Sequence, residues 1–118
     1  MPKGPSPPEL LPLTPPVFHI LLALAGEPMH GYAIMQEVAR QSEGHYKLGP
    51  GTLYDNLQRL MAQGGVEEVA GKTGSRRRDY RLSRIGRGVL SGEIERLEGV
   101  VRRARACLKP ASLKPGRA

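Results

Sequence analysis

The sequence contains no tryptophan, one phenylalanine and four tyrosines, and one of its 118 residues, Cys107, is a cysteine. A core for this chain must therefore be built from leucine, isoleucine, valine, methionine and alanine. The lone cysteine excludes an internal disulfide, which is typical of a protein kept in a reducing compartment. No apolar run approaches the roughly twenty residues that cross a bilayer, and the first residues do not resemble a signal peptide. We therefore expect a cytoplasmic protein that has no membrane partner.

The sequence also lacks the patterns that accompany catalysis or metal binding. His19, His30 and His45 are scattered, and none is spaced to act with Cys107 as a nucleophile and its base. There is no cluster of carboxylates, and no lysine follows Gly49–Gly51 as it would in a phosphate-binding loop. We therefore expect no enzymatic activity, no cofactor and no metal site.

Acidic side chains are few, and they are unevenly distributed along the chain. The formal net charge is +7, but residues 1–71 carry a net charge of −3 and residues 72–118 carry +10. A solvated basic surface is one interpretation of such an excess. The sharp separation of charge instead favours contact with a nucleic acid, whose phosphates attract a concentrated basic region.

Both ends of the chain are rich in proline or basic residues. Residues 1–13, which include "GPSPPELLPL", predict a flexible arm, although its leucines are able to dock on another element. Residues 109–118 predict a disordered basic tail. The structured part of the protein is thus expected between residues 14 and 108.

Three amphipathic patterns predict helices in the first half of the chain. The first begins near Thr14–Pro16 and ends before Gly26, the second spans about 30–41, and the third spans about 51–63. Their expected core-facing residues are Phe18, Leu21, Leu22 and Ala25, then Ile34, Met35 and Val38, then Leu53, Leu57, Leu60 and Met61.

After the third helix, the spacing of the apolar residues changes to the alternation typical of strands. It predicts two strands, 66–70 and 76–82, joined by the turn sequence "GKTGS". Alternation places Tyr80 and Leu82 inward, whereas Arg77, Asp79 and Arg81 are expected on the opposite, exposed face. The stretch 72–87 carries a net charge of +6 and predicts a basic hairpin.

The last predicted helix spans residues 84–108, with Ser83 as its cap. Its apolar residues recur at alternating steps of four and three, which is the seam of a coiled coil. We expect this seam to pair with a second copy of the chain; the alternative is that the helix folds back on the first helix. The predicted dimer contacts are Phe18, Leu90, Ile94, Leu97, Val101, Ala104 and Leu108.

This order of elements predicts a mostly α fold with a small β-hairpin: a winged helix-turn-helix at 14–83 followed by a dimerisation helix at 84–108. In such folds the third helix enters the DNA major groove. Steps of 100° per residue place Thr52, Asp55, Gln58 and Arg59 away from its apolar stripe, with Tyr54 on the flank. Asp55 is able to accept a hydrogen bond from cytosine, but an ion pair with Arg59, one turn on, is the favoured interpretation.

Three segments together resemble the PadR family of bacterial transcriptional regulators: "MHGYAIMQEV", "LGPGTLYDNLQRLMAQGGV" and "SRRRDYRLSRIGRGVL". The resemblance covers about residues 17–100, and the single C-terminal helix is similar to the compact branch of the family. It implies a dimeric winged helix, a repressor in most members, with Tyr32, Thr52 and Tyr54 on the DNA-facing surface. Some relatives bind small effectors near the dimer interface. An effector site in this chain, if present, is expected between the first and last helices.

The functional prediction is a sequence-specific, homodimeric transcriptional repressor that binds an inverted repeat in double-stranded DNA. The alternative is a basic interaction module that binds an acidic protein, or DNA without regard to sequence. The predicted DNA-binding residues are Tyr32, Gly51, Thr52, Tyr54, Asp55, Gln58, Arg59, Lys72, Arg76, Arg77 and Arg78.

Overall fold

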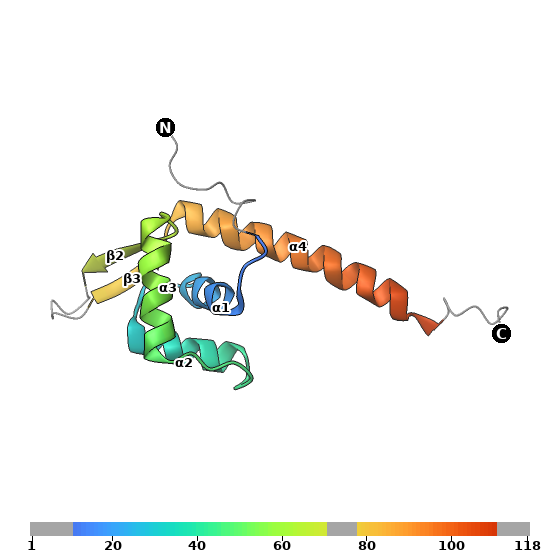
Figure 1. Ribbon diagram of the computed structural model, residues 1–118, viewed down its shortest axis with the longest axis horizontal. Coiled ribbons are helices and arrows are strands. Elements are labelled where there is room, and N and C mark those ends of the chain that lie inside the picture. Colours follow the sequence, from blue (N-terminus) through green and yellow to red (C-terminus); the bar gives the residue numbers. More distant parts are fainter. Residues whose placement is uncertain (1–10, 71–77, 111–118) are drawn as a thin grey trace.

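The computed structural model in Figure 1 describes residues 11–70 and 78–110, which form a winged helix-turn-helix with a long C-terminal helix. The predicted fold class and order of elements are confirmed, with one short strand added. In chain order the elements are α1 (Pro15–Leu24), β1 (Met29–His30), α2 (Gly31–Gln41), α3 (Pro50–Ala62), β2 (Val66–Ala70), β3 (Arg78–Leu82) and α4 (Arg84–Leu108).

Two helices begin at the hydroxyl caps expected from the sequence. The Thr14 side chain accepts a hydrogen bond from the amide of Val17 at 3.4 Å, and prolines occupy the first positions of α1. The Ser83 hydroxyl accepts from the amide of Gly86 at 3.0 Å and caps α4. Each cap satisfies an amide that has no partner within its own helix, and so fixes where that helix starts.

The core lies where α1 meets α2, α3, the sheet and the first turns of α4. On α1 the fully buried residues differ in part from those predicted, because Phe18, Leu22 and Ala25 are only partly buried. Because α1 is apolar on almost every side, the spacing of its apolar residues does not indicate which face is buried. The buried hydrophobic residues of the helices are Ile20, Leu21, Ala23, Leu24, Ile34, Val38, Leu53, Leu57, Leu60, Val89 and Leu90.

The sheet is antiparallel, with strand order β1–β3–β2. The sequence predicted only a hairpin, because the two residues of β1 are too few to show alternation. β1 makes β3 the central strand, and His30 pairs with Asp79 across it. Asp79 is therefore 4% exposed, and its predicted place on an open face is wrong.

The helix α4 divides into a packed part and a projecting part. Near its start, Val89 and Leu90 join the core, and the Arg87 guanidinium donates to the carbonyl of Ala25 at 3.2 Å. From Val100 to its end at Leu108 every residue of α4 is exposed, and Figure 1 shows this half extending away from the other helices. The alternative that this helix folds back on α1 therefore holds for its first turns. Pairing of the remaining seam with a second copy stays a prediction. Leu90, a predicted dimer contact, is already buried within the protomer.

The turn after α3 docks tightly on the start of α4. The amide of Ser83 donates to the carbonyl of Gly65 at 3.0 Å, and its hydroxyl donates to the carbonyl of Gly64 at 2.5 Å. A Cβ added to Gly86 would collide with the carbonyl oxygen of Gly65 and would lie 2.7 Å from Leu82 Cδ1. A Cβ on Gly65 itself would meet nothing closer than 3.8 Å. The close approach therefore requires glycine at 86 but not at 65.

We expect Gly86→Ala to destabilise the protein by about 1–3 kcal/mol, because the backbone of the turn must move to admit the methyl group. The loss should exceed the gain of about 1 kcal/mol that alanine brings to a helix interior. Gly65→Ala is the matched control and should be close to neutral. Urea denaturation of the two variants tests this, and equal stabilities would contradict the packing described.

Candidate nucleic-acid interface

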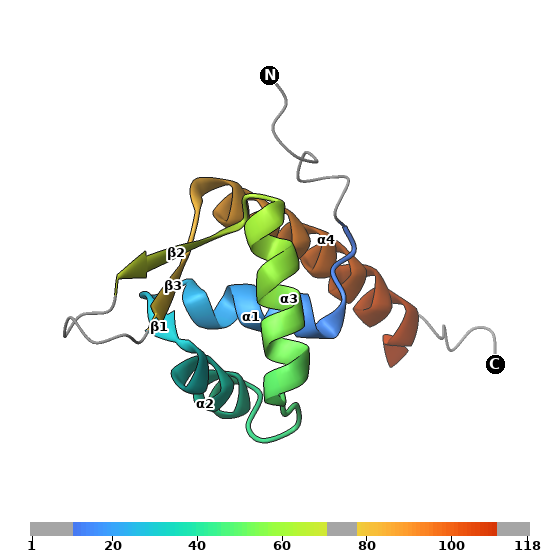
Figure 2. The same ribbon diagram turned by 60° about the vertical axis from the view of Figure 1, so that its left-hand side comes forward.

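The helix α3 buries one side and presents the other to solvent. Leu53, Leu57 and Leu60 hold it against α1, and Figure 2 shows α3 lying across the front of that helix. The predicted DNA contacts of this helix lie away from those leucines, and each is exposed: Gly51, Thr52, Tyr54, Asp55, Gln58 and Arg59. A rigid helix with an exposed row of hydrogen-bonding side chains is suited to enter a groove of DNA.

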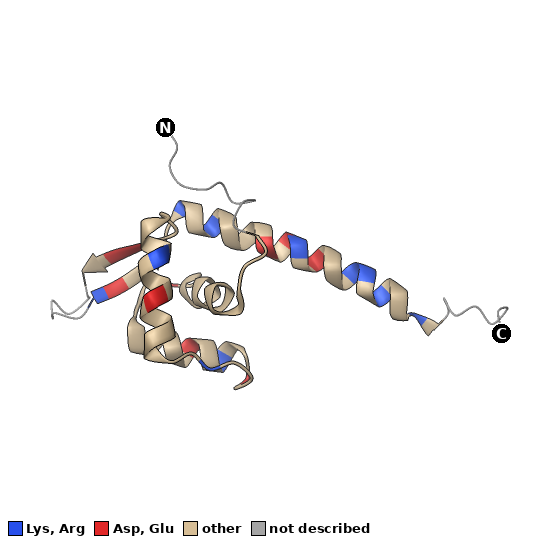
Figure 3. Ribbon diagram, viewed as in Figure 1, with Lys and Arg blue, Asp and Glu red and all other residues tan. Residues whose placement is uncertain are grey.

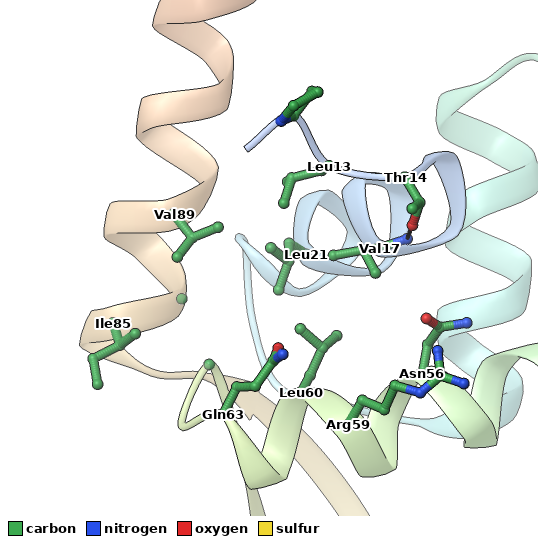
Figure 4. A pocket seen from close by; sticks show the side chains of 13 residues that line it. Leu13, Thr14, Val17, Leu21, Asn56, Arg59, Leu60, Gln63, Ile85 and Val89 are labelled. Atoms are coloured by element: carbon green, nitrogen blue, oxygen red, sulfur yellow. Dashed lines mark hydrogen bonds between the residues drawn. The ribbon is translucent and has the colours of Figure 1, made fainter. Parts of the chain in front are cut away.

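Within α3, one polar side chain is buried, and one predicted ion pair is not formed. Asn56 is buried at 8% exposure, and its amide nitrogen donates to the carbonyl of Thr52 at 2.8 Å. The predicted ion pair between Asp55 and Arg59 is not formed among the described residues. Arg59 instead lines a pocket beside Asn56 (Figure 4). Asp55 therefore remains available to a ligand at the centre of the exposed face.

The two motifs "HGY" and "PGTLY" meet in space. Tyr32 is 61% exposed and Tyr54 is 45% exposed, one on α2 and the other on α3. The hydroxyl of Tyr54 lies directly over Gly31, where an added Cβ would collide with it. Gly31 thus sets how closely α3 approaches α2. Tyr54 acts as a packing residue as well as a predicted DNA contact.

The wing, defined as β2, β3 and the segment between them, is less basic in its strands than the sequence count implied. Arg78 donates to Glu68 at 2.8 Å, and Arg81 donates to Glu67 at 2.9 Å. The two strands carry three acidic and two basic residues, a net charge of −1 (Figure 3). The count of +6 covered one strand and omitted the glutamates opposite. The other predicted wing contacts, Lys72, Arg76 and Arg77, lie outside the described residues.

A pocket of about 210 Å³ opens between the start of α1, the second half of α3 and the start of α4 (Figure 4). Its apolar lining includes Leu21, Leu60 and Val89, whereas Asn56, Arg59 and Gln63 of α3 supply polar groups. Arg59 is the charged residue among those that line it, and none of them is aromatic. Apart from Thr14, the polar side chains that border this pocket therefore come from α3, the helix whose other side carries the predicted DNA contacts.

One wall of this pocket is held by Glu93, a residue that no sequence motif singled out. Its carboxylate accepts from the amide of Leu13 at 3.2 Å and from Arg96 at 2.7 and 2.9 Å. The hydrogen bond from Arg96 is the main reason that the pKa of Glu93 is lowered, although burial acts against it. Leu11 and Leu13 pack on the core, so the described end of the predicted flexible arm is docked. The available signal was the position of Glu93, three residues after Leu90 and four before Leu97, on the apolar side of the helix.

Among the described ranges, no group of three histidine, cysteine, aspartate or glutamate side chains is arranged to hold a metal ion. No helix in those ranges has the length and apolar character needed to span a membrane.

The model of the Transcriptional regulator PadR-like family matches residues 20–92. This chain belongs to the PadR-like family of transcriptional regulators. The matched part of this PadR-like protein contains the exposed face of α3, the wing and the packed half of α4. Tyr32, Thr52 and Tyr54, for which the resemblance implies a place on the DNA-facing surface, all fall within the matched residues.

Individual relatives agree with this assignment. The transcriptional regulator Rv3488 of Mycobacterium tuberculosis is 39% identical over 85 residues, which cover 71% of this chain and 77% of that protein. A transcriptional regulator from Clostridium thermocellum has a TM-score of 0.67 at 24% identity, covering 79% of this chain and 92% of the other. Bacillus subtilis PadR, solved with operator DNA, has a TM-score of 0.62 at 19% identity, covering 70% of this chain and 48% of PadR. At such identities the two structures establish the fold.

We expect the Glu93 ion pair to make stability depend on pH. Because the folded-state pKa lies below the ordinary 4.5, the pair stabilises the protein above that pH, and the stabilisation is lost as the pH falls through the lowered pKa. Glu93→Gln should cost about 1–2 kcal/mol at pH 7 and should flatten the fall in Tm below pH 4.5.

Thermal denaturation between pH 7 and pH 3 measures this effect. Glu95→Gln, which removes the same charge from an exposed position of α4, is the control. A Glu93→Gln variant with the same pH dependence as the wild type would contradict the assignment.

Proposed function

We propose that this PadR-like protein is a sequence-specific, homodimeric repressor that binds an inverted-repeat operator in the cytoplasm. The observation that carries the proposal is the exposed polar face of α3, held rigidly by three buried leucines. Thr52, Asp55 and Gln58 on that face match the hydrogen-bonding groups of base edges. The likeness to Bacillus subtilis PadR, whose structure contains operator DNA, supports the same docking geometry.

The projecting half of α4 supports dimerisation. Ile94, Val101 and Leu108 are 39%, 47% and 79% exposed, although they belong to one apolar seam. A helix whose apolar stripe faces water is stabilised when a second helix covers it. We therefore infer that two copies pair through α4 between Ile94 and Leu108, with Leu97 and Ala104 in the same seam and the partly buried Phe18 at its edge.

Such a dimer presents two copies of α3 to one side of the duplex. If they enter successive major grooves, their separation is about 34–36 Å, and the operator is an inverted repeat. Lys72, Arg76 and Arg77 of the wing would add contacts to phosphates on either side. The logarithm of affinity should then fall with the logarithm of salt concentration by about 0.9 for each phosphate contacted.

The alternative is an interaction module whose basic residues bind an acidic protein, or DNA of any sequence. A gel shift with the DNA upstream of the protein's own gene separates the two. Retention that survives an excess of random-sequence competitor supports the repressor. Binding that the competitor removes supports the module.

We expect Leu97→Glu to convert the dimer into a monomer and to abolish operator binding, because a charge in the seam cannot be covered by a second helix. Ala106→Glu is the control, because it lies nine residues, and hence half a turn, away on the same helix and is exposed. Light scattering and the gel shift report the two effects. A dimer that survives Leu97→Glu would exclude this seam as the interface.

We further propose that the pocket beside α3 holds a small effector that releases DNA. Its apolar lining, the absence of aromatic residues among those that line it, and the position of Arg59 favour a phenolic or acidic molecule over a stacked cation. Phenolic compounds should release operator DNA in a titration, cationic compounds should not, and Val17→Phe should block release by filling the pocket. Release by cations alone would place the effector elsewhere.

A further inference from the structure

Two adjacent glutamates on β2 each form an ion pair across the wing. Glu68 accepts from Arg78 at 2.8 Å, and Glu67 accepts from Arg81 at 2.9 Å. Because neighbouring residues of a strand point to opposite faces, the two pairs lie on opposite faces of the wing. Both pairs join a glutamate to an arginine at nearly the same position along the strand. One pair can therefore serve as the control for the other, because they differ mainly in which face of the wing they occupy.

The face that carries Glu68 is the one that continues toward the exposed surface of α3. Glu68 is opposite Tyr80 on β3, and Tyr80 is opposite Met29 on β1, so the three residues form one row across the sheet. Two residues beyond Met29, Gly31 contacts the hydroxyl of Tyr54 on α3. Burial raises the pKa of Tyr80, and the nearby Glu68 and Tyr54 raise it further, which is consistent with their closeness. The Glu67–Arg81 pair faces away from this row.

We propose that Glu68 determines specificity by restraining Arg78 from binding phosphates on DNA of any sequence. The inference rests on the proposed function, because it assigns Glu68 a role in the same DNA contact. Arg78 forms an ion pair with the Glu68 carboxylate on the side of the wing next to α3. The same carboxylate repels an approaching phosphate. On its operator the contacts of α3 fix the position of the wing, and Arg78 keeps Glu68 as its partner.

The exposure of this pair leaves Arg78 within reach of DNA. The side chains of Arg78 and Glu68 are 62% and 35% exposed, so the pair is open to solvent and is readily opened. On random DNA α3 does not hold the wing in one register, so an Arg78 without its carboxylate partner would bind any phosphate that the wing meets. Glu68 opposes this contact. The pair thus penalises non-specific binding more than it penalises operator binding, which is how a repulsive element improves discrimination.

The test uses the full chain and compares Glu68→Gln with Glu67→Gln, which remove the same charge from opposite faces. Binding to a random-sequence duplex and to the DNA upstream of the protein's own gene is measured by fluorescence anisotropy at several salt concentrations. Glu68→Gln should tighten binding to random DNA about fivefold, and steepen its salt dependence by about 0.9 for each phosphate gained, while operator affinity changes less than twofold. Glu67→Gln should change both affinities less than twofold.

A double variant, Glu68→Gln with Arg78→Ala, shows whether Arg78 carries the effect. The gain on random DNA should disappear in it. A gain that persists without Arg78, an equal gain in Glu67→Gln, or no gain in Glu68→Gln would each overturn the assignment of Glu68. Wild-type protein that binds neither duplex would instead contradict the proposed function itself, so the two failures are distinguishable.

Discussion

The packing of three leucines on α3 against α1 is the constraint on which the other features depend. Leu53, Leu57 and Leu60 lie on one stripe and are almost fully buried, so the rotation of α3 about its axis is fixed. Once this rotation is set, the polar residues between the leucines face solvent, apart from the buried Asn56. Burial of each such side chain contributes about 1.5–3 kcal/mol to the free energy of unfolding. The exposed residues contribute little to that packing, so their identities are not constrained by it. The residues that stabilise α3 and the residues proposed to bind DNA therefore lie mainly on opposite sides of one helix.

The glycines make a second set of constraints because they let elements approach within distances that a side chain would prevent. Gly31 receives the ring of Tyr54, and Gly86 receives the carbonyl of Gly65. The first contact sets α3 against α2, and the second sets the wing and α3 against α4. We infer that α4 is the dimerisation helix, so it would set the distance between two copies. The contact at Gly86 therefore links the position of α3, the helix proposed to contact DNA, to α4.

Several basic side chains of this protein form ion pairs with nearby glutamates. The glutamates of β2 neutralise both described arginines of β3, and Glu93 neutralises Arg96 while it holds Leu13. In contrast, Arg102, Arg103 and Arg105 in the projecting half of α4 are exposed, and Figure 3 shows that half as basic. A net charge of +7 therefore says little about where a phosphate would be held. Pairing across strands decides which cations are available.

The sequence by itself determined the helices, their caps at Thr14 and Ser83, and the exposed residues of α3, because each depends on neighbours within one or two turns of the chain. It did not determine which face of the almost wholly apolar α1 is buried, the two-residue strand β1, or the burial of Asp79. Nor did it show that Glu67 and Glu68 face arginines, that Arg59 borders a pocket, or that Glu93 binds the amide of Leu13. Those features arise between residues distant in sequence, and only the tertiary structure brings such partners together.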